Sequence, residues 1–119
     1  MNIESFRSYC LTKPGVTEEF PFDDTTLVFK VMGKMFAATG LDEQTFEVNL
    51  KCDPERAIEL REQYNEIRPG FHMNKEHWNT IDFGGTIPQT MLTELIDDSY
   101  NLVVRNMTKK MREELKKQT

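Results

Sequence analysis

The residue types best suited to chemistry are concentrated in one stretch, residues 68–80, whose sequence is RPGFHMNKEHWNT. It contains both histidines and the only tryptophan, together with two asparagines, an arginine and a lysine. Such a mixture of polar groups is costly to bury and is typical of a surface that binds a ligand. The alternative, and the commoner arrangement, is a loop that apolar residues anchor while its polar side chains hydrogen-bond their own backbone.

Metal binding and nucleophilic catalysis are weakly supported by the sequence. His72 and His77 are five residues apart, which suits neither one helix face nor one strand face, and a zinc site needs further ligands. Cys52 directly precedes a helix start at Asp53-Pro54, where the macrodipole can activate a thiol, but a buried inert cysteine is far more common. The sequence contains no serine elbow, phosphate-binding glycine loop or dinucleotide fingerprint. We therefore expect a non-enzymatic protein without metal or cofactor.

Length and composition are those of a small globular protein. The 119 residues, 38% of them hydrophobic, suffice for one modest core, so we expect a single domain over residues 1–119. No apolar run approaches the roughly 18 residues that a membrane-spanning helix needs, and the first ten residues do not resemble an export signal. Two cysteines are too few for a disulfide scaffold. We expect a cytoplasmic monomer with reduced thiols and no membrane partner.

The charge of the chain is unevenly distributed. The net charge is −5, which is the wrong sign for a protein that coats nucleic acid electrostatically. Residues 105–119 nevertheless carry a local charge of +4, so the remaining residues carry −9. The basic residues of this segment are Arg105, Lys109, Lys110, Arg112, Lys116 and Lys117. Such a segment is usually a solvated terminal helix, and the alternative is a patch that faces an anion.

Capping residues and periodicity predict the order of the elements. Asn2 is placed to cap a helix over residues 3–11, Pro88 opens the longest helix, and Thr108 caps a final helix over residues 109–117. A further helix follows Asp53-Pro54. Alternation and turn residues predict strands over residues 16–20, 26–31, 34–39, 46–50 and 78–83. This order predicts an α+β two-layer sandwich of the form α-β(3-4)-α-β(2)-α.

Strand parity predicts which side chains share a face of the sheet. Val28, Met32, Phe36 and Ala38 have the parity of one face, opposite the apolar side chains of residues 27, 29 and 31. If Val28, Met32 and Phe36 are exposed on the open face, they form an apolar patch of the kind that binds a protein partner.

Sequence motifs that span nearly the whole chain carry a family resemblance. They are Lys13-Pro14-Gly15 after the first helix, EEFPFDDTTLVFKVMGKMFA, LKCDPE, RPGFHMNKEHWNT and LIDDSYNLVVRNMTKK. In this order they resemble the MmcQ/YjbR family of small bacterial proteins, which is usually labelled DNA-binding. The resemblance implies an antiparallel sheet with helices on one face, similar to secretion-chaperone-like and frataxin-like folds. It also implies DNA contact through a proposed double-winged arrangement of hairpins.

Three functional hypotheses follow from the sequence. The first is DNA binding through hairpin and loop surfaces, in which Lys30 and Lys34 flank the tip of one hairpin. The predicted nucleic-acid-binding residues are Lys30, Lys34, Lys51, Arg68, His72, Asn74, Lys75, His77, Trp78 and Asn79. The second is a protein-interaction module that uses the open sheet face. The third is a small-molecule or enzymatic cleft at residues 68–80, in which Arg68 holds an anion and a histidine moves protons.

The only tryptophan is predicted to lie away from the main core. By alternation Trp78, Thr80 and Asp82 share one side of their strand, and the apolar Ile81 and Phe83 share the other. Trp78 then either covers a secondary cluster with residues 71 and 73 or forms an exposed binding platform. We favour the structural cluster.

Overall fold

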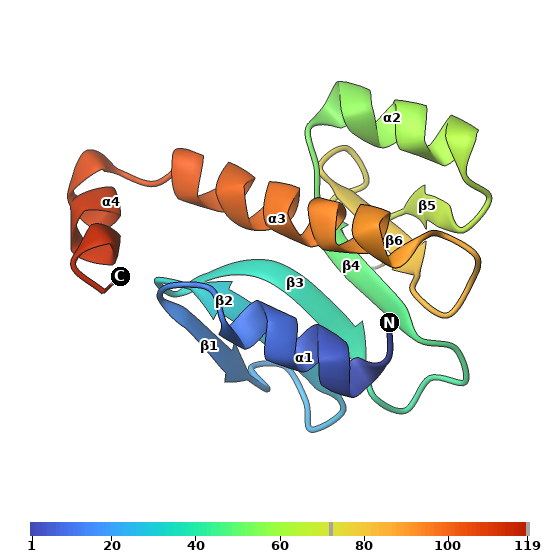
Figure 1. Ribbon diagram of the computed structural model, residues 1–119, viewed down its shortest axis with the longest axis horizontal. Coiled ribbons are helices and arrows are strands. Elements are labelled where there is room, and N and C mark those ends of the chain that lie inside the picture. The colour runs from blue at the N-terminus through green and yellow to red at the C-terminus, as the bar shows by residue number, and fades with distance from the viewer. Residues whose placement is uncertain (72, 119) are drawn as a thin grey trace.

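The computed structural model describes residues 1–71 and 73–118, in which four helices cover one face of a six-stranded antiparallel sheet or its edges (Figure 1). The helices are α1 (Ile3–Leu11), α2 (Pro54–Gln63), α3 (Gln89–Arg105) and α4 (Lys109–Lys116). The strands are β1 (Val16–Glu19), β2 (Thr26–Val31), β3 (Lys34–Gly40), β4 (Glu47–Lys51), β5 (Ile67–Pro69) and β6 (Trp78–Asp82), in the spatial order β1-β2-β3-β4-β6-β5. The predicted α+β architecture is confirmed.

Helix α1 begins at a capping box and packs on the sheet through aromatic side chains. The carboxamide of Asn2 accepts the Ser5 backbone N–H at 2.8 Å, and the Ser5 hydroxyl lies 3.0 Å from the backbone N–H of Asn2. Phe6 is fully buried in edge-to-face contact with Phe29 of β2 and Phe83, with ring centroids 5.4 and 5.5 Å apart. These contacts attach α1 to the inner face of the sheet.

The β2–β3 hairpin contains a bulge that changes the predicted faces of its side chains. Phe29 pairs with Ala37 whereas Lys30 pairs with Met35, so Phe36 is an extra residue on β3. The bulge turns Phe36 into the main core, where it is fully buried, and the prediction that it lies on the outer face was wrong. Val28 and its partner Ala38 do face outward, but both are buried as well.

The apolar patch of Val28, Met32 and Phe36 that the sequence predicted is therefore not exposed on the open face of the sheet. Met32 also leaves the alternation, because it lies in the hairpin turn with a φ of +51° and packs against the main core. Gly33 follows with a φ of +80°, and two consecutive positive values fit the tight turn of a twisted hairpin. The side chains of Met32 and Phe36 therefore contribute no exposed surface to the open face.

Helix α3 crosses the inner face and is fixed to it by one polar side chain. Ser99 is fully buried, and its hydroxyl donates to the Phe36 carbonyl at 2.5 Å while accepting the Lys51 N–H at 2.9 Å. The β3–β4 pairing ends at Ala37 and Leu50, and Phe36 and Lys51 are the next residues beyond that end of the ladder. The hydroxyl therefore replaces a direct ladder hydrogen bond where the bulge disturbs the pairing.

Helix α2 covers the β5–β6 edge of the sheet and begins as predicted, with the Asp53 carboxylate accepting the Glu55 N–H at 3.0 Å. Arg61 on this helix reaches the sheet. Its Nε donates to the Asn79 side chain at 2.7 Å and its Nη2 to the Trp78 carbonyl at 3.3 Å. The guanidinium thus ties α2 to the start of β6.

Helix α4 folds back from the end of α3 toward the β2–β3 turn (Figure 1). The hydroxyl of Thr108 accepts the Met111 N–H at 3.2 Å, which confirms the predicted cap. Leu115 is buried, and its Cδ1 would lie 2.5 Å from a Cβ at Gly15, whose φ is +74°. The Gln118 amide donates to the Met32 sulfur at 3.3 Å. Helix α4 is therefore packed against the hairpin tip rather than extended into solvent.

Candidate functional site

The β5–β6 loop, residues 70–77, folds back over the outer face of the sheet. The Gly70 N–H donates to the Trp78 carbonyl at 2.8 Å, and the Phe71 N–H donates to the Thr80 hydroxyl at 3.0 Å. The Asn74 side chain accepts the His77 N–H at 3.3 Å and that of its neighbour at position 76 at 2.9 Å. These bonds are the self-contained loop chemistry that the structural interpretation predicted. His72 lies outside the described residues.

Two of the predicted base contacts are buried. Trp78 is 8% exposed on the outer face, on the same side as Thr80, and Asn79 is 1% exposed beneath Arg61 on the inner face. The predicted alternation along β6 is confirmed. A base could stack on the Trp78 ring only after the groups that bury it had moved, because the residue is 8% exposed.

Most of the predicted phosphate contacts on the sheet are already engaged within the protein. Lys30 pairs with Glu19 at 3.3 Å, and Arg68 forms an ion pair with Glu47. The Lys75 ammonium lies 3.4 Å from the Gly70 carbonyl. Lys30 and Lys51 are partly buried, and Lys34, directly after the hairpin turn, is the exposed one of the three cations of β2, β3 and β4. These contacts therefore use much of the positive charge that was predicted to face DNA on the sheet.

This outer face contains a cleft of about 460 Å³ between two loops, which we call the open-face cleft. Its floor consists of small outward side chains of β3, at Ala38 and Gly40, beside Asn49 of β4. The cleft exists because these positions carry little side-chain volume. Its walls come from the β1–β2 loop, residues 20–25, through Phe22, and from the β5–β6 loop through Phe71. A volume of this size is in the range of small-molecule sites.

The open-face cleft continues into a smaller hollow of about 270 Å³ toward β5 and β6. The two hollows share Gly40, Asn49 and Phe71 among their lining residues, and the smaller one adds Arg68 and Thr80. The Thr80 hydroxyl donates to the Asn49 side-chain oxygen at 2.5 Å. Residues 68–80 therefore supply part of a concave surface, as the third hypothesis predicted, although His77 does not line it.

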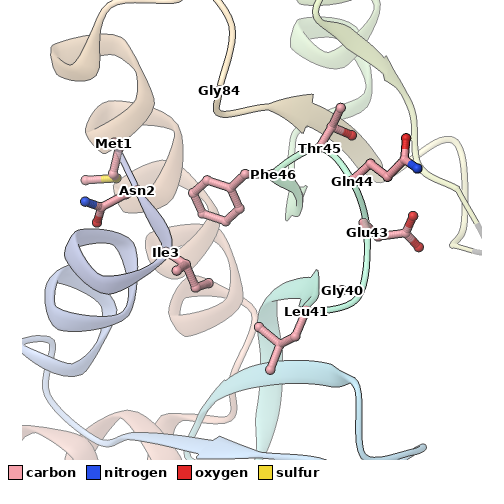
Figure 2. Close-up of a pocket in the computed structure, with 10 residues that line it drawn as sticks. All are labelled: Met1, Asn2, Ile3, Gly40, Leu41, Glu43, Gln44, Thr45, Phe46 and Gly84. Atoms are coloured by element: carbon pink, nitrogen blue, oxygen red, sulfur yellow. The ribbon is translucent and has the colours of Figure 1, made fainter.

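A second hollow of about 400 Å³ lies at the start of α1, across the β3–β4 loop from the open-face cleft. Figure 2 shows the ring of Phe46 extending toward the start of α1, whereas the side chains of Glu43 and Gln44 point away. Its lining is largely apolar, and Phe46 joins it to the aromatic cluster beneath α1. The sequence did not predict this hollow, because its walls come from residues 1–3, residues 40–46 and Gly84, which are far apart along the chain.

A third hollow of about 400 Å³ separates α2 from α3 and contains the one cysteine considered as a nucleophile. Burial raises the pKa of Cys52, and burial raises that of Cys10 to about 12, so both thiols are protonated at neutral pH. Arg56 lies 3.6 Å from the Asp98 carboxylate, whose pKa is raised chiefly by burial. The geometry assigns the cysteines to packing. Within residues 1–71 and 73–118, no cluster of three or more potential ligands could hold a metal ion.

A patch of exposed cations lies at the α4 end of the molecule, and we call it the basic end. Its members come from the end of α3, from α4 and from the β2–β3 hairpin, which α4 contacts through the Gln118–Met32 hydrogen bond. They are Lys34, Arg105, Lys109, Lys110, Lys116 and Lys117. Lys117 lies 3.9 Å from Glu114, and because both side chains are more than half exposed this ion pair contributes little to stability. The sequence could not show that Lys34 lies at the same end of the molecule as the C-terminal cations.

Comparisons with known proteins agree with this architecture. The sequence model of the YjbR family matches residues 11–102. The chain belongs to the YjbR family. It is 36% identical over 107 residues to the uncharacterized protein YbdF of Escherichia coli O157:H7, covering 90% of this chain and 88% of that protein. It is 34% identical over 112 residues to the uncharacterized protein YjbR of Escherichia coli K12, covering 94% and 95%.

Solved structures place the same fold in other bacteria. The crystal structure of Deinococcus radiodurans protein DR2400 superposes with a TM-score of 0.90 at 44% identity, covering 96% of this chain and 87% of that one. A crystal structure from Pseudomonas syringae superposes with a TM-score of 0.73 at 28% identity, covering 86% and 98%. The span matched by the YjbR model includes the floor of the open-face cleft and ends before α4. None of the helices in the described part of the chain is long and apolar enough to cross a membrane.

Proposed function

We propose that this YjbR-family protein binds DNA, and that the basic end makes the phosphate contacts. The observation that carries the proposal is the convergence of six exposed cations from three separate elements on one end of a chain whose net charge is −5. The DNA-binding label implied by the sequence motifs supports the same class of partner. Phosphate contacts from Lys and Arg supply most of the affinity of non-specific DNA binding.

The placement of two lysines supports a role beyond solubility. Lys109 and Lys110 occupy the first turn of α4, which contains no acidic residue. The helix macrodipole favours negative charge at this position, so two cations there oppose helix stability. A terminal helix selected only for stability would carry acids in this turn. The arrangement suits a surface that needs positive charge for a partner.

The acidic remainder of the chain limits how the DNA can lie. Residues 1–104 carry a charge of −9, so their long-range field repels the duplex and leaves the basic end as the region of attraction. With four to six cations in contact, the logarithm of the affinity should fall with the logarithm of the salt concentration with a slope of about −4 to −5. Binding should therefore weaken by about 10²–10³-fold between about 50 and 200 mM salt.

The test is fluorescence polarisation with a short labelled DNA duplex. The double variant Lys109→Gln/Lys110→Gln should bind about tenfold more weakly at about 50 mM salt, and its salt slope should be shallower by about 2. The matched control is Lys51→Gln/Lys75→Gln, which removes the same charge from the outer face of the sheet. The control should retain the affinity of the parent protein.

Two results would contradict the proposal. The first is no binding of the parent protein at about 50 mM salt, where phosphate-driven affinity is largest. The second is an equal loss of affinity in the two double variants, because that would report total charge rather than a contact at the basic end. A labelled single strand run in parallel distinguishes duplex binding from binding of unpaired bases.

A further inference from the structure

The open-face cleft has features that the proposed DNA contact does not use. It lies on the outer face of the sheet. The basic end is formed by the end of α3, by α4 and by the β2–β3 hairpin, and Figure 1 shows α4 at one end of the molecule. We propose that the open-face cleft binds a small organic cation, an ammonium group carried on an apolar or aromatic body. This site goes beyond DNA binding and does not depend on it.

The walls of the cleft present aromatic side chains to solvent. Phe22 is 71% exposed and Phe71 is 65% exposed, and the two side chains come from different loops. Solvent-exposed aromatic surface that lines a concave site is available for contact with a ligand. An aromatic face attracts a cation placed over it, and two rings lining one cleft form the beginning of an aromatic cage.

The charge of the lining selects a cation. Asp23 and Glu43 line the cleft, and Glu47 lines its extension, where Arg68 neutralises it. Within the described lining this leaves a net charge of −2. The Asp23 carboxylate accepts hydrogen bonds from the backbone and hydroxyl groups of Thr25 and its neighbour, which hold its pKa below the ordinary value. It is therefore ionised at neutral pH.

The floor adds shape and one polar contact. Ala38 and Gly40 leave room for an apolar body, and Met35 and Met73 can adapt to its outline. Asn49 adds a polar side chain of fixed orientation, because its carboxamide oxygen accepts the Thr80 hydroxyl.

The test is a titration of the isotope-labelled full chain followed by two-dimensional amide NMR. The probe is benzyltrimethylammonium, which combines a cation with an aromatic ring, and the controls are benzyl alcohol and benzoate. We expect saturable shifts of the amides of Gly40, Asn49 and Phe71, with benzoate at least tenfold weaker than the cation. Phe71→Ala and Glu43→Gln should each weaken binding about three- to tenfold.

The matched control variant is Ile58→Ala, which removes an exposed apolar side chain from α2, outside the cleft. It should bind the probe as the parent protein does, and the dispersion of each spectrum shows that each variant is folded. Shifts confined to other regions, or equal affinity for the cation and benzoate, would overturn the proposal. Lys109→Gln/Lys110→Gln should retain the probe, so that failure at the basic end and failure at the cleft are distinguishable.

Discussion

Replacing Trp78 by alanine should destabilise the protein by about 3–5 kcal/mol, although this side chain lies outside the main core. Its ring is 8% exposed on the outer face of β6, beneath the loop that begins at Gly70. A tryptophan buries about 150–250 Å². At about 25 cal/mol per Å² this burial corresponds to about 4–6 kcal/mol, which is an upper bound because the unfolded chain also shields part of the ring.

The assay is urea unfolding followed by far-ultraviolet circular dichroism, since the substitution removes the only tryptophan fluorophore. With a denaturant dependence of about 2 kcal/mol per molar, the midpoint should fall by about 2 M. Phe71→Ala is the matched control, because Phe71 is an aromatic residue of the same loop that is 65% exposed. Its midpoint should change by less than the equivalent of about 0.5 kcal/mol.

An unchanged midpoint for Trp78→Ala would refute the reasoning, because it would mean that the ring does not hold the loop against the sheet. Equal losses in the Trp78 and Phe71 variants would also refute it, since the argument depends on the difference in burial between the two rings. A stable Trp78→Ala protein with weakened DNA binding would instead support the exposed platform that the sequence left as the alternative.

Three further outcomes follow from the described contacts. Gly70→Ala should cost about 1–3 kcal/mol in thermal unfolding, because the new Cβ would meet the Trp78 Cβ at 2.8 Å and its carbonyl at 3.0 Å; an unchanged melting temperature would contradict this close approach. Asp23→Asn should be less stable than the parent above about pH 5; the difference should shrink as the pH falls through the ordinary Asp pKa of about 3.9 and vanish only below the lowered folded-state pKa, because the carboxylate stabilises the fold only while it is ionised. Cys10 and Cys52 should react with a thiol reagent only after unfolding, since both are buried and protonated; rapid labelling of the native protein would exclude this assignment.

Local chemistry made most of the fold predictable. Three helices begin at capping side chains, Asn2, Asp53 and Thr108, each of which accepts a backbone N–H two or three residues later. Such starts can be predicted because all the interacting groups lie within a few residues of one another. The tight turn at Met32–Gly33 and the alternation along β6 are equally local. The position of Phe36 is different, because a bulge in the pairing with β2 moves it into the core and no periodicity within its own strand reports that shift.

The candidate sites depended on contacts between distant residues. The stretch that contains Phe71 and Trp78 was predicted as the place for a site, and it does form one wall of the open-face cleft. The opposite wall, through Phe22, and the small floor at Ala38 belong to other elements. Similarly, Lys34 joins the basic end only because α4 folds back onto the hairpin tip. Such juxtapositions arise from tertiary packing, which composition and spacing do not encode.

The hydroxyl of Ser99 has a mechanical consequence for both proposed sites. A helix held by apolar contacts alone can rotate or slide on a sheet at small cost, whereas Ser99 must stay between the Phe36 carbonyl and the Lys51 N–H to satisfy both groups. These two hydrogen bonds therefore fix the position of α3 along the sheet near the middle of the helix. Its last residue, Arg105, carries the chain into α4, while β3 and β4 beneath Ser99 form the floor of the cleft. The Ser99 hydroxyl therefore helps to fix the position of the basic end relative to the cleft, because it joins the helix that leads to the basic end to the strands that form the floor of the cleft.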